Sequence, residues 1–125
     1  MNSRPPVSLL MSVDTEEDNW LPATTGITVE NIREIPRFQS AMEAIGIRPT
    51  YFTNYQVSRV GWATDALKGA AEGGRAEIAA HIHPWNTPPL EGDPFGTNTM
   101  LKNLPVALQI AKLRFLTEHH RQVYG

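Results

Sequence analysis

Short apolar runs alternate along the chain with longer segments whose hydrophobic residues recur at helical spacing. The apolar runs cover residues 7–14, 47–55 and 76–83, and each lies close to a proline or a glycine. Runs of this length that are rich in aliphatic, β-branched and aromatic residues are typical of buried strands. The pattern therefore predicts three strands.

Two helices are predicted between these strands. In residues 29–46 the apolar positions follow a helical period, with a restart at Pro36 and a glycine stop at the end. Residues 66–74 form the second helix, for which Thr64 or Asp65 can supply the N-cap.

A third, amphipathic helix is predicted from Pro105 nearly to the end of the chain. Its apolar stripe contains Leu104, Leu108, Ala111 and Phe115, and the residues largely outside the stripe are Lys112, Arg114, Glu118 and Arg121. His119 and His120 fall among arginine and glutamine residues on the polar side. Both histidines are therefore predicted to lie on the surface.

The order of these elements predicts the fold class. Strands and helices alternate three times, which indicates a parallel α/β sheet with outer helices, or part of a barrel. Residues 84–98 contain four prolines and two glycines, so they are predicted to form a long loop. Three strands alone would leave one sheet edge and one sheet face uncovered.

Composition narrows the classes of partner and site. The 125 residues carry a formal net charge of -2 and no basic block, so nucleic acid is not expected as a partner. Cysteine is absent, so a metal ion would need histidine and carboxylate ligands. The apolar run near the N-terminus is too short for a signal peptide or a membrane span. A cytoplasmic protein with no membrane segment is expected.

Histidines and carboxylates follow two of the predicted strands. His81 and His83 are two residues apart at the end of the third strand, so both imidazoles point to the same face. Asp14 ends the first strand. Three more acids come soon after it, namely Glu16, Glu17 and Asp18. Because active sites of α/β folds lie at the carboxyl ends of the strands, these side chains are candidates for one site.

Two interpretations of this group remain open at this point. Two histidines and one carboxylate, with open positions for water, are a ligand set suited to zinc or another divalent ion. Alternatively, the acids form a solvated loop and the histidines, next to Pro84 and Trp85, are packed and hydrogen-bonded.

A family resemblance rests on three segments of the chain. They read LLMSVDTEEDNW, IPRFQSAMEAIGIRPTYFTNYQV and GGRAEIAAHIHPWNTPP. Together they resemble the N-terminal half of a polysaccharide deacetylase of the NodB-homology group, in the subgroup with an H-x-H-P-W motif. The resemblance implies an irregular (β/α) barrel, of which residues 1–125 would be the N-terminal portion of the catalytic domain. It also implies a metal-dependent hydrolase that removes N-acetyl groups from carbohydrate polymers.

The resemblance implies roles for individual residues. Asp14 matches the general base of the family motif, while the metal-binding aspartate of that motif falls on a threonine here. Glu17 is the expected replacement, with Glu16 or Asp18 as alternatives. His81 matches the first metal histidine, and His83 would replace a second histidine that the family places four residues onward. The ion would be zinc, with cobalt, nickel or manganese as alternatives.

Aromatic and polar residues near the histidines are the expected substrate contacts. Trp85, Trp20 and the loop from Asn86 to Phe95 would form one wall of a cleft for sugar rings, or the two tryptophans would simply pack under the loop. The family supplies an arginine that orients the base and a histidine that acts as general acid from later strands. Neither motif is present in this sequence.

Three functions remain open from the sequence. The first is an N-terminal fragment of a polysaccharide deacetylase with little activity alone. The second is a metal-binding or interaction module without activity, which forms a homo-oligomer through its exposed sheet edge. The third is a hydrolase of the same fold that acts on small amides or imides.

Overall fold

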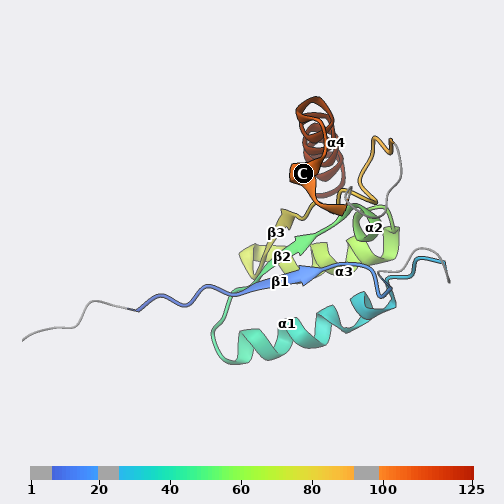
Figure 1. Ribbon diagram of the computed structural model, residues 1–125. Coiled ribbons are helices and arrows are strands. Elements are labelled where there is room, and N and C mark those ends of the chain that lie inside the picture. Colours follow the sequence, from blue (N-terminus) through green and yellow to red (C-terminus); the bar gives the residue numbers. More distant parts are fainter. Residues whose placement is uncertain (1–6, 20–25, 92–98) are drawn as a thin grey trace, which may run out of the picture.

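The computed structural model describes residues 7–19, 26–91 and 99–125. A small parallel sheet lies at the centre, with helices α1 and α3 packed near it and the long C-terminal helix α4 beside β3 (Figure 1). All three strands predicted from the sequence are present, although each is only four residues long.

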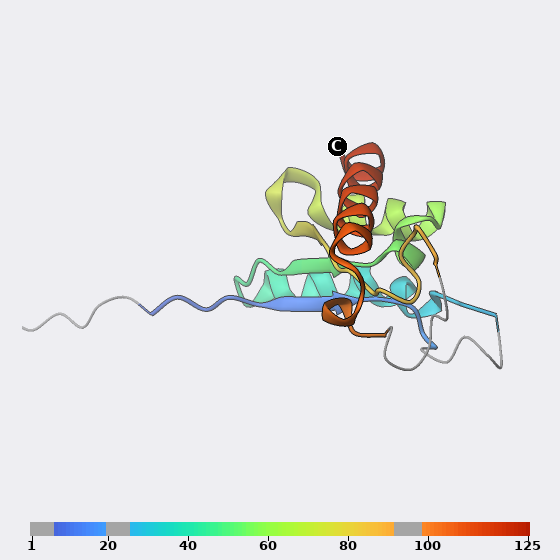
Figure 2. The same ribbon diagram turned by 45° about the horizontal axis from the view of Figure 1, so that its top comes forward.

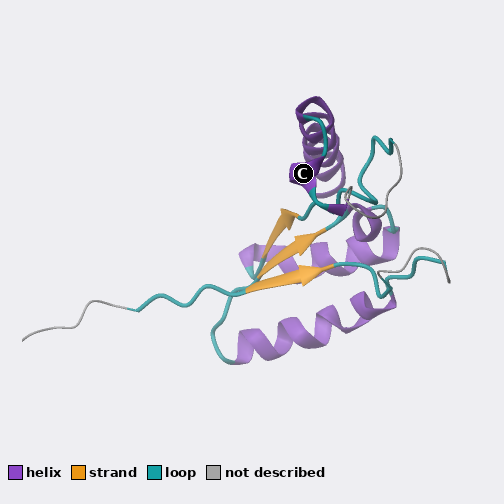
Figure 3. Ribbon diagram, viewed as in Figure 1, coloured by secondary structure: helices purple, strands orange, loops and turns teal. Residues whose placement is uncertain are grey.

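The sheet contains β1 (Ser12–Thr15), β2 (Thr50–Thr53) and β3 (Glu77–Ala80), in that order and all parallel (Figure 3). Strand β1 is shorter than predicted, because its pairing with β2 begins at Ser12. The preceding segment runs away from the sheet (Figure 2), and Val7 is 96% exposed. The apolar residues before Ser12 therefore contribute no strand.

The barrel that the resemblance implies is not present. In the described residues the sheet stops at three strands, with β1 and β3 as its two edges, so it does not close on itself. An eight-stranded barrel takes about 250 residues, and half of that length cannot supply the strands for closure. The fold of the described residues is a small open α/β sheet, and the expectation of a partial (β/α) barrel was wrong.

The hydrophobic core lies between one face of the sheet and two helices. Val13, Tyr51 and Ile78 point from the three strands toward α1 (Ile35–Ala44) and α3 (Gly61–Ala71). The fully buried Leu67 of α3 and the fully buried Tyr51 anchor this core. Tyr51 also donates a hydrogen bond to Gln39 of α1 at 2.8 Å, which satisfies its buried hydroxyl group. Burial raises the pKa of Tyr51 to about 12.

Helix α1 follows the sequence prediction closely, whereas α3 does not. The segment before Pro36 forms a 3-10 helix, η1 (Glu30–Glu34), and α1 continues directly from it. Helix α3 begins several residues before the predicted start, with Val60 at the N-cap, and neither Thr64 nor Asp65 caps it. Thr64 instead donates to the carbonyl of Gly61 within the first turn.

A short helix between β2 and α3 was not predicted. Helix α2 (Tyr55–Ser58) begins directly after Asn54, whose side-chain oxygen accepts a hydrogen bond from the amide of Val57 at 3.1 Å. This N-cap fixes the Asn54 side chain at the carboxyl end of β2. Four residues are too few to produce a helical period in the sequence.

Helix α4 (Val106–Tyr124) contacts β3, α2 and α3 and lies on the opposite side of the molecule from α1 (Figure 1). Lys112 was predicted to lie outside its apolar stripe, but the side chain is buried. Its ammonium group donates to the carbonyls of Thr87 and Pro89 at 2.6 and 2.7 Å. These bonds hold the loop after β3 against α4, and burial lowers the pKa of Lys112.

His119 and His120 are half-buried, so their predicted surface position was wrong. The ring of His119 packs edge-on against Tyr55 of α2, with centroids 5.1 Å apart. His120 lies against Tyr124, and its Nε2 atom is 3.4 Å from the hydroxyl of Thr53 in β2. The two histidines therefore help to attach the end of α4 to the sheet.

This packing gives a pH-dependent stability. Burial, together with the neighbouring His119, lowers the pKa of His120 below 6.5, and the contact with Thr53 only partly opposes it. The unfolded chain thus binds a proton more readily, so the contribution of His120 is present above pH 6.5 and is lost as the pH falls below it. We expect the urea midpoint to decrease between about pH 7.5 and pH 5.5, and to decrease less in His120→Gln. An equal decrease in both proteins would contradict this assignment.

None of the helices in the described part of the chain combines the length and apolar character needed to cross a membrane.

Candidate metal centre

The carboxyl ends of β1 and β3 bring the predicted acids and histidines together. The sheet ladder continues past both strand ends, because the amide of Asn54 donates to Thr15 at 3.3 Å and the amide of His81 donates to Thr53 at 2.8 Å. Residues just beyond the strands therefore keep the strand alternation. Glu16 and His81 leave the sheet at the same rim.

Three of these side chains could hold a metal ion. Glu16, His81 and His83 each offer one ligand atom, and the three atoms lie within 4.8 Å of one another. The rings of His81 and His83 meet edge to face, with centroids 4.7 Å apart. Two imidazoles and one carboxylate match the donor types that zinc prefers in hydrolytic sites. Among the described residues this is the one such group.

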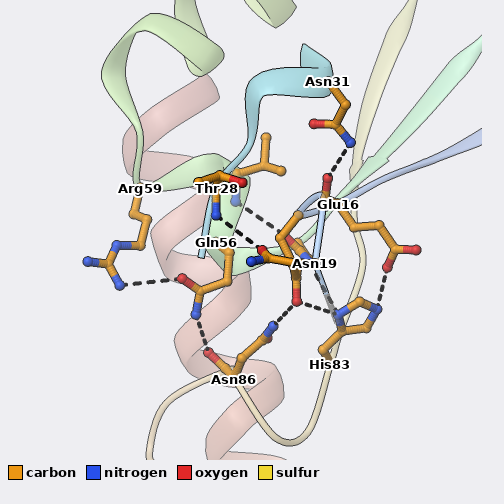
Figure 4. Close-up of polar contacts among 11 residues, drawn as sticks. Glu16, Asn19, Thr28, Asn31, Gln56, Arg59, His83 and Asn86 are labelled. Carbon is orange, nitrogen blue, oxygen red and sulfur yellow. Dashed lines mark hydrogen bonds and ion pairs between the residues drawn. The ribbon is translucent and has the colours of Figure 1, made fainter. Parts of the chain in front are cut away.

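The carboxylate of Glu16 supports this interpretation. Its Oε2 atom is buried and lies 2.7 Å from Nε2 of His83 (Figure 4), and it accepts no hydrogen bond from any other described group. A buried carboxylate oxygen normally accepts several hydrogen bonds or binds a cation. Together with nitrogen atoms of His81 and His83, this oxygen atom could bind a metal ion.

Glu17 lies on the other side of His83. Its Oε1 atom is 3.6 Å from Nδ1 of His83 and accepts a hydrogen bond from the Asn86 amide at 2.6 Å. Its Oε2 atom accepts a hydrogen bond from the Asn54 amide. Burial alone raises the pKa of Glu17, but the bonds with His83 and Asn54 outweigh it, so the pKa lies below 4.5. Glu17 is therefore an ionised carboxylate in a nearly closed site, 4% exposed.

Glu17 orients His83, and Asn54 in turn positions Glu17. Asn54 is fixed as the N-cap of α2, and its side-chain amide donates to Oε2 of Glu17. A carboxylate at one imidazole nitrogen fixes the ring and leaves the other nitrogen for a metal, an arrangement common in zinc sites. In His83 that second nitrogen, Nε2, is the one that faces Glu16.

Asp18 has a structural role instead of a ligand role. Its carboxylate accepts hydrogen bonds from the amides of Glu30 and Asn31 at 2.6 and 3.0 Å, and from the hydroxyl of Thr28. These bonds hold the start of η1 beside the acidic loop. Asn31 in turn donates to the carbonyl of Glu16 at 2.9 Å (Figure 4), which fixes the backbone of the candidate ligand.

Asp14, the predicted general base, lies at the open edge of the group. It points to the sheet face opposite the core, its side chain is 66% exposed, and its Oδ1 atom is 3.6 Å from Nδ1 of His81. An exposed carboxylate beside a candidate ligand can exchange protons with solvent. The structure thus brings Asp14, His81 and His83 together, as the sequence predicted.

The predicted substrate residues differ in their positions. Trp85 stacks on His83 with ring centroids 4.3 Å apart and an angle of 19° between the planes. Asn86 is buried and bonded to Glu17, and its carbonyl accepts from Gln56 at 3.3 Å (Figure 4), so it supports the site from behind. Trp20 and Phe95 lie outside the described residues.

The sequence interpretation favoured Glu17 as the carboxylate ligand, whereas the structure brings Glu16 to the histidines. A signal for this was present in the sequence. Asp14 and Glu16 are two residues apart, as His81 and His83 are, so strand alternation places them on one face. Asn54 was missed, although an asparagine directly after a strand is a typical helix N-cap.

Comparisons of the chain with models of protein families, with curated proteins and with solved structures found no match. The function is therefore argued from the site itself.

Proposed function

We propose that this chain is the N-terminal portion of the catalytic domain of a metal-dependent hydrolase. The enzyme would remove N-acetyl groups from a carbohydrate polymer, as the family resemblance implies. The observation that carries the proposal is the group of Glu16, His81 and His83 beside the exposed carboxylate of Asp14. Two imidazoles, one carboxylate and a nearby base are the parts that hydrolysis of an amide at a metal requires.

The donor set favours zinc, with cobalt, nickel or manganese as alternatives. When bound, such an ion supplies Lewis acidity toward a carbonyl oxygen and a water molecule. Glu16, His81 and His83 would hold it. The Oε2 atom of Glu16 supports the fit, because this buried carboxylate oxygen has His83 as its one described polar partner and its charge needs compensation.

The protein residues have distinct tasks in this proposal. Glu17 keeps His83 in one orientation through its contact with Nδ1. Asp14 accepts the proton of the attacking water, because it is exposed and lies at the open side of the group. The ring of Trp85 covers one face of His83 and limits access of solvent from that side. A contact of Trp85 with a sugar ring remains a prediction.

Acetate release tests the proposal. We expect the full chain with added zinc to release acetate from N-acetylglucosamine oligomers only slowly, because the arginine and general-acid histidine motifs of the family are absent from this sequence, and we expect a chelator to stop the release. Asp14→Asn should lower the rate by roughly two to four orders of magnitude, the usual contribution of a general base, while zinc binding is retained. The exposed Asp65 of α3 provides the control, and Asp65→Asn should leave the rate unchanged.

Three results would contradict the proposal or replace it. Release of ammonia or acid from small amides, but not of acetate from the oligomers, would favour the hydrolase of small amides. Zinc binding without any hydrolysis would favour the module without activity. Equal rates in Asp14→Asn and the wild type would remove Asp14 from the mechanism.

A further inference from the structure

A pocket lies between the start of η1 and the helices α2 and α3, and none of the three candidate metal ligands lines it. Its volume is about 410 Å³, which lies within the range of pockets that bind small molecules. Val29, Val60 and Trp62 supply apolar surface, and Thr28, Gln56 and Arg59 supply polar groups. An apolar wall with a few convergent polar groups is typical of a site for an organic ligand.

Arg59 is the charged group that distinguishes this pocket. Its guanidinium donates a weak hydrogen bond to Gln56 at 3.4 Å (Figure 4) and lies 5.9 Å from the centre of the Tyr55 ring. In the part of the chain that the structure describes, no carboxylate forms an ion pair with it. By contrast, Arg33, near the same pocket, is paired with Glu30 at 2.5 Å. Arg59 therefore has most of its planar set of donors available.

The other charge at the pocket is neutralised within the protein. Glu30 lines the pocket, but its carboxylate is bound by Arg33, whose guanidinium lies 4.2 Å from the centre of the Trp62 ring. A second carboxylate entering the pocket would thus meet Arg59 and no unpaired acid from the lining. The remaining walls suit a ring, because Trp62 and the two valines present apolar surface.

We propose that this pocket binds a small molecule that carries one carboxylate on a ring, with Arg59 holding the carboxylate and Trp62 and Val60 contacting the ring. A fork of two parallel N–H donors is the geometry by which arginine recognises carboxylates. A neutral ring of the same size lacks this interaction. Charge is therefore the main determinant of selectivity at this site.

The pocket is separate from the metal centre, although hydrogen bonds connect them. Gln56 lines the pocket and donates to the carbonyl of Asn86, whose side chain donates to Glu17. Glu17 faces Nδ1 of His83, and Glu16 faces the other nitrogen of that ring. A carboxylate at Arg59 consequently binds without occupying the metal ligands.

Two pairs of probes test the proposal by NMR titration of the labelled full chain. Glucuronate is compared with glucose, and benzoate with benzyl alcohol, so that each acid has a neutral counterpart and the two rings distinguish a sugar from an aromatic ligand. We expect at least one acid to shift the indole resonance of Trp62 in a saturable manner, and its neutral counterpart to bind at least about tenfold more weakly.

Variants place the binding at Arg59. Arg59→Gln should weaken binding of the acid at least about tenfold, and Arg59→Lys should give an intermediate loss, because it keeps the charge without the planar fork. Arg37→Gln, which changes an exposed arginine that does not line the pocket, should bind the acid as the wild type does. Binding of neither acid, equal binding of the neutral counterparts, or unchanged binding in Arg59→Gln would overturn the proposal.

Discussion

Replacement of Glu16 by glutamine is expected to weaken zinc binding by at least about a hundredfold. Loss of a residue that only hydrogen-bonds to a metal ligand costs roughly 10–100-fold in affinity, and loss of a ligand itself should cost more. The carboxylate of Glu16 is buried next to His83, and its Oε2 atom accepts no other described hydrogen bond. Glutamine keeps the shape of the side chain but removes its charge. His81→Ala should have a similar effect, since it removes one of the three candidate ligands. Competition with a chromophoric chelator measures the affinity.

A matched histidine provides the control for this experiment. His119 lies on α4, where it packs against Tyr55 and Phe115, and it does not belong to the candidate metal group. His119→Asn should therefore bind zinc as the wild type does. If it loses zinc as fully as His81→Ala does, the ion binds at the C-terminal helix and the proposed centre is wrong.

Replacement of Glu17 by alanine is expected to lower the free energy of unfolding by about 3–5 kcal/mol in the absence of metal, the usual cost of removing one partner of a buried charged group. The carboxylate is 4% exposed and accepts hydrogen bonds from Asn54 and Asn86. Its removal leaves both amides and Nδ1 of His83 without their acceptor. Urea denaturation followed by circular dichroism measures the loss.

An exposed glutamate shows what loss of a carboxylate costs elsewhere in the chain. The side chain of Glu34 is 72% exposed and lies 3.6 Å from Arg37. Glu34→Gln should change the free energy of unfolding by no more than about 0.5 kcal/mol, because exposed ion pairs contribute little. A similarly small effect for Glu17→Ala would mean that water enters the site and that Glu17 does not hold His83 in place.

Local patterns in the sequence were sufficient to predict the three strands and the position of the acids and histidines at their carboxyl ends. The three apolar runs, separated by helical segments, indicated parallel strands, and the spacing of His81 and His83 indicated one shared face. Both inferences rest on periodicities that the backbone imposes whatever the tertiary context. Asp14 could likewise be placed at the carboxyl end of the first strand.

The choice among the three following acids required tertiary information. Glu16 approaches His83 and Glu17 is buried between Asn54 and Asn86, and only the packing of α2 and the loop after β3 separates these roles. The burial of Lys112 also depends on tertiary contacts, because its partners, the carbonyls of Thr87 and Pro89, lie far away in the sequence. A sequence pattern does not show such partners, and it therefore predicts a surface position for a charged residue.

The pattern of residues allowed either an open parallel sheet or part of a barrel, and the family resemblance favoured the barrel. The pattern predicted three strands, and three are present, with β1 and β3 as open edges of the described sheet. The exposed side chains of Ser12, Asp14 and Glu77 lie on the sheet face opposite the core residues of the strands. A sheet of this size brings Glu16, His81 and His83 together without closing into a barrel.

The binding of a metal ion by Glu16, His81 and His83 is tested most directly by a crystal structure of the zinc-soaked protein with data collected at the zinc absorption edge. We expect an anomalous peak about 2.0–2.2 Å from one oxygen of Glu16 and one nitrogen of each histidine, as in other zinc sites. Glu17 should remain on Nδ1 of His83. If no peak lies there and Nε2 of His83 still contacts Glu16 at 2.7 Å, the group is a structural ion pair and the proposed metal centre is wrong.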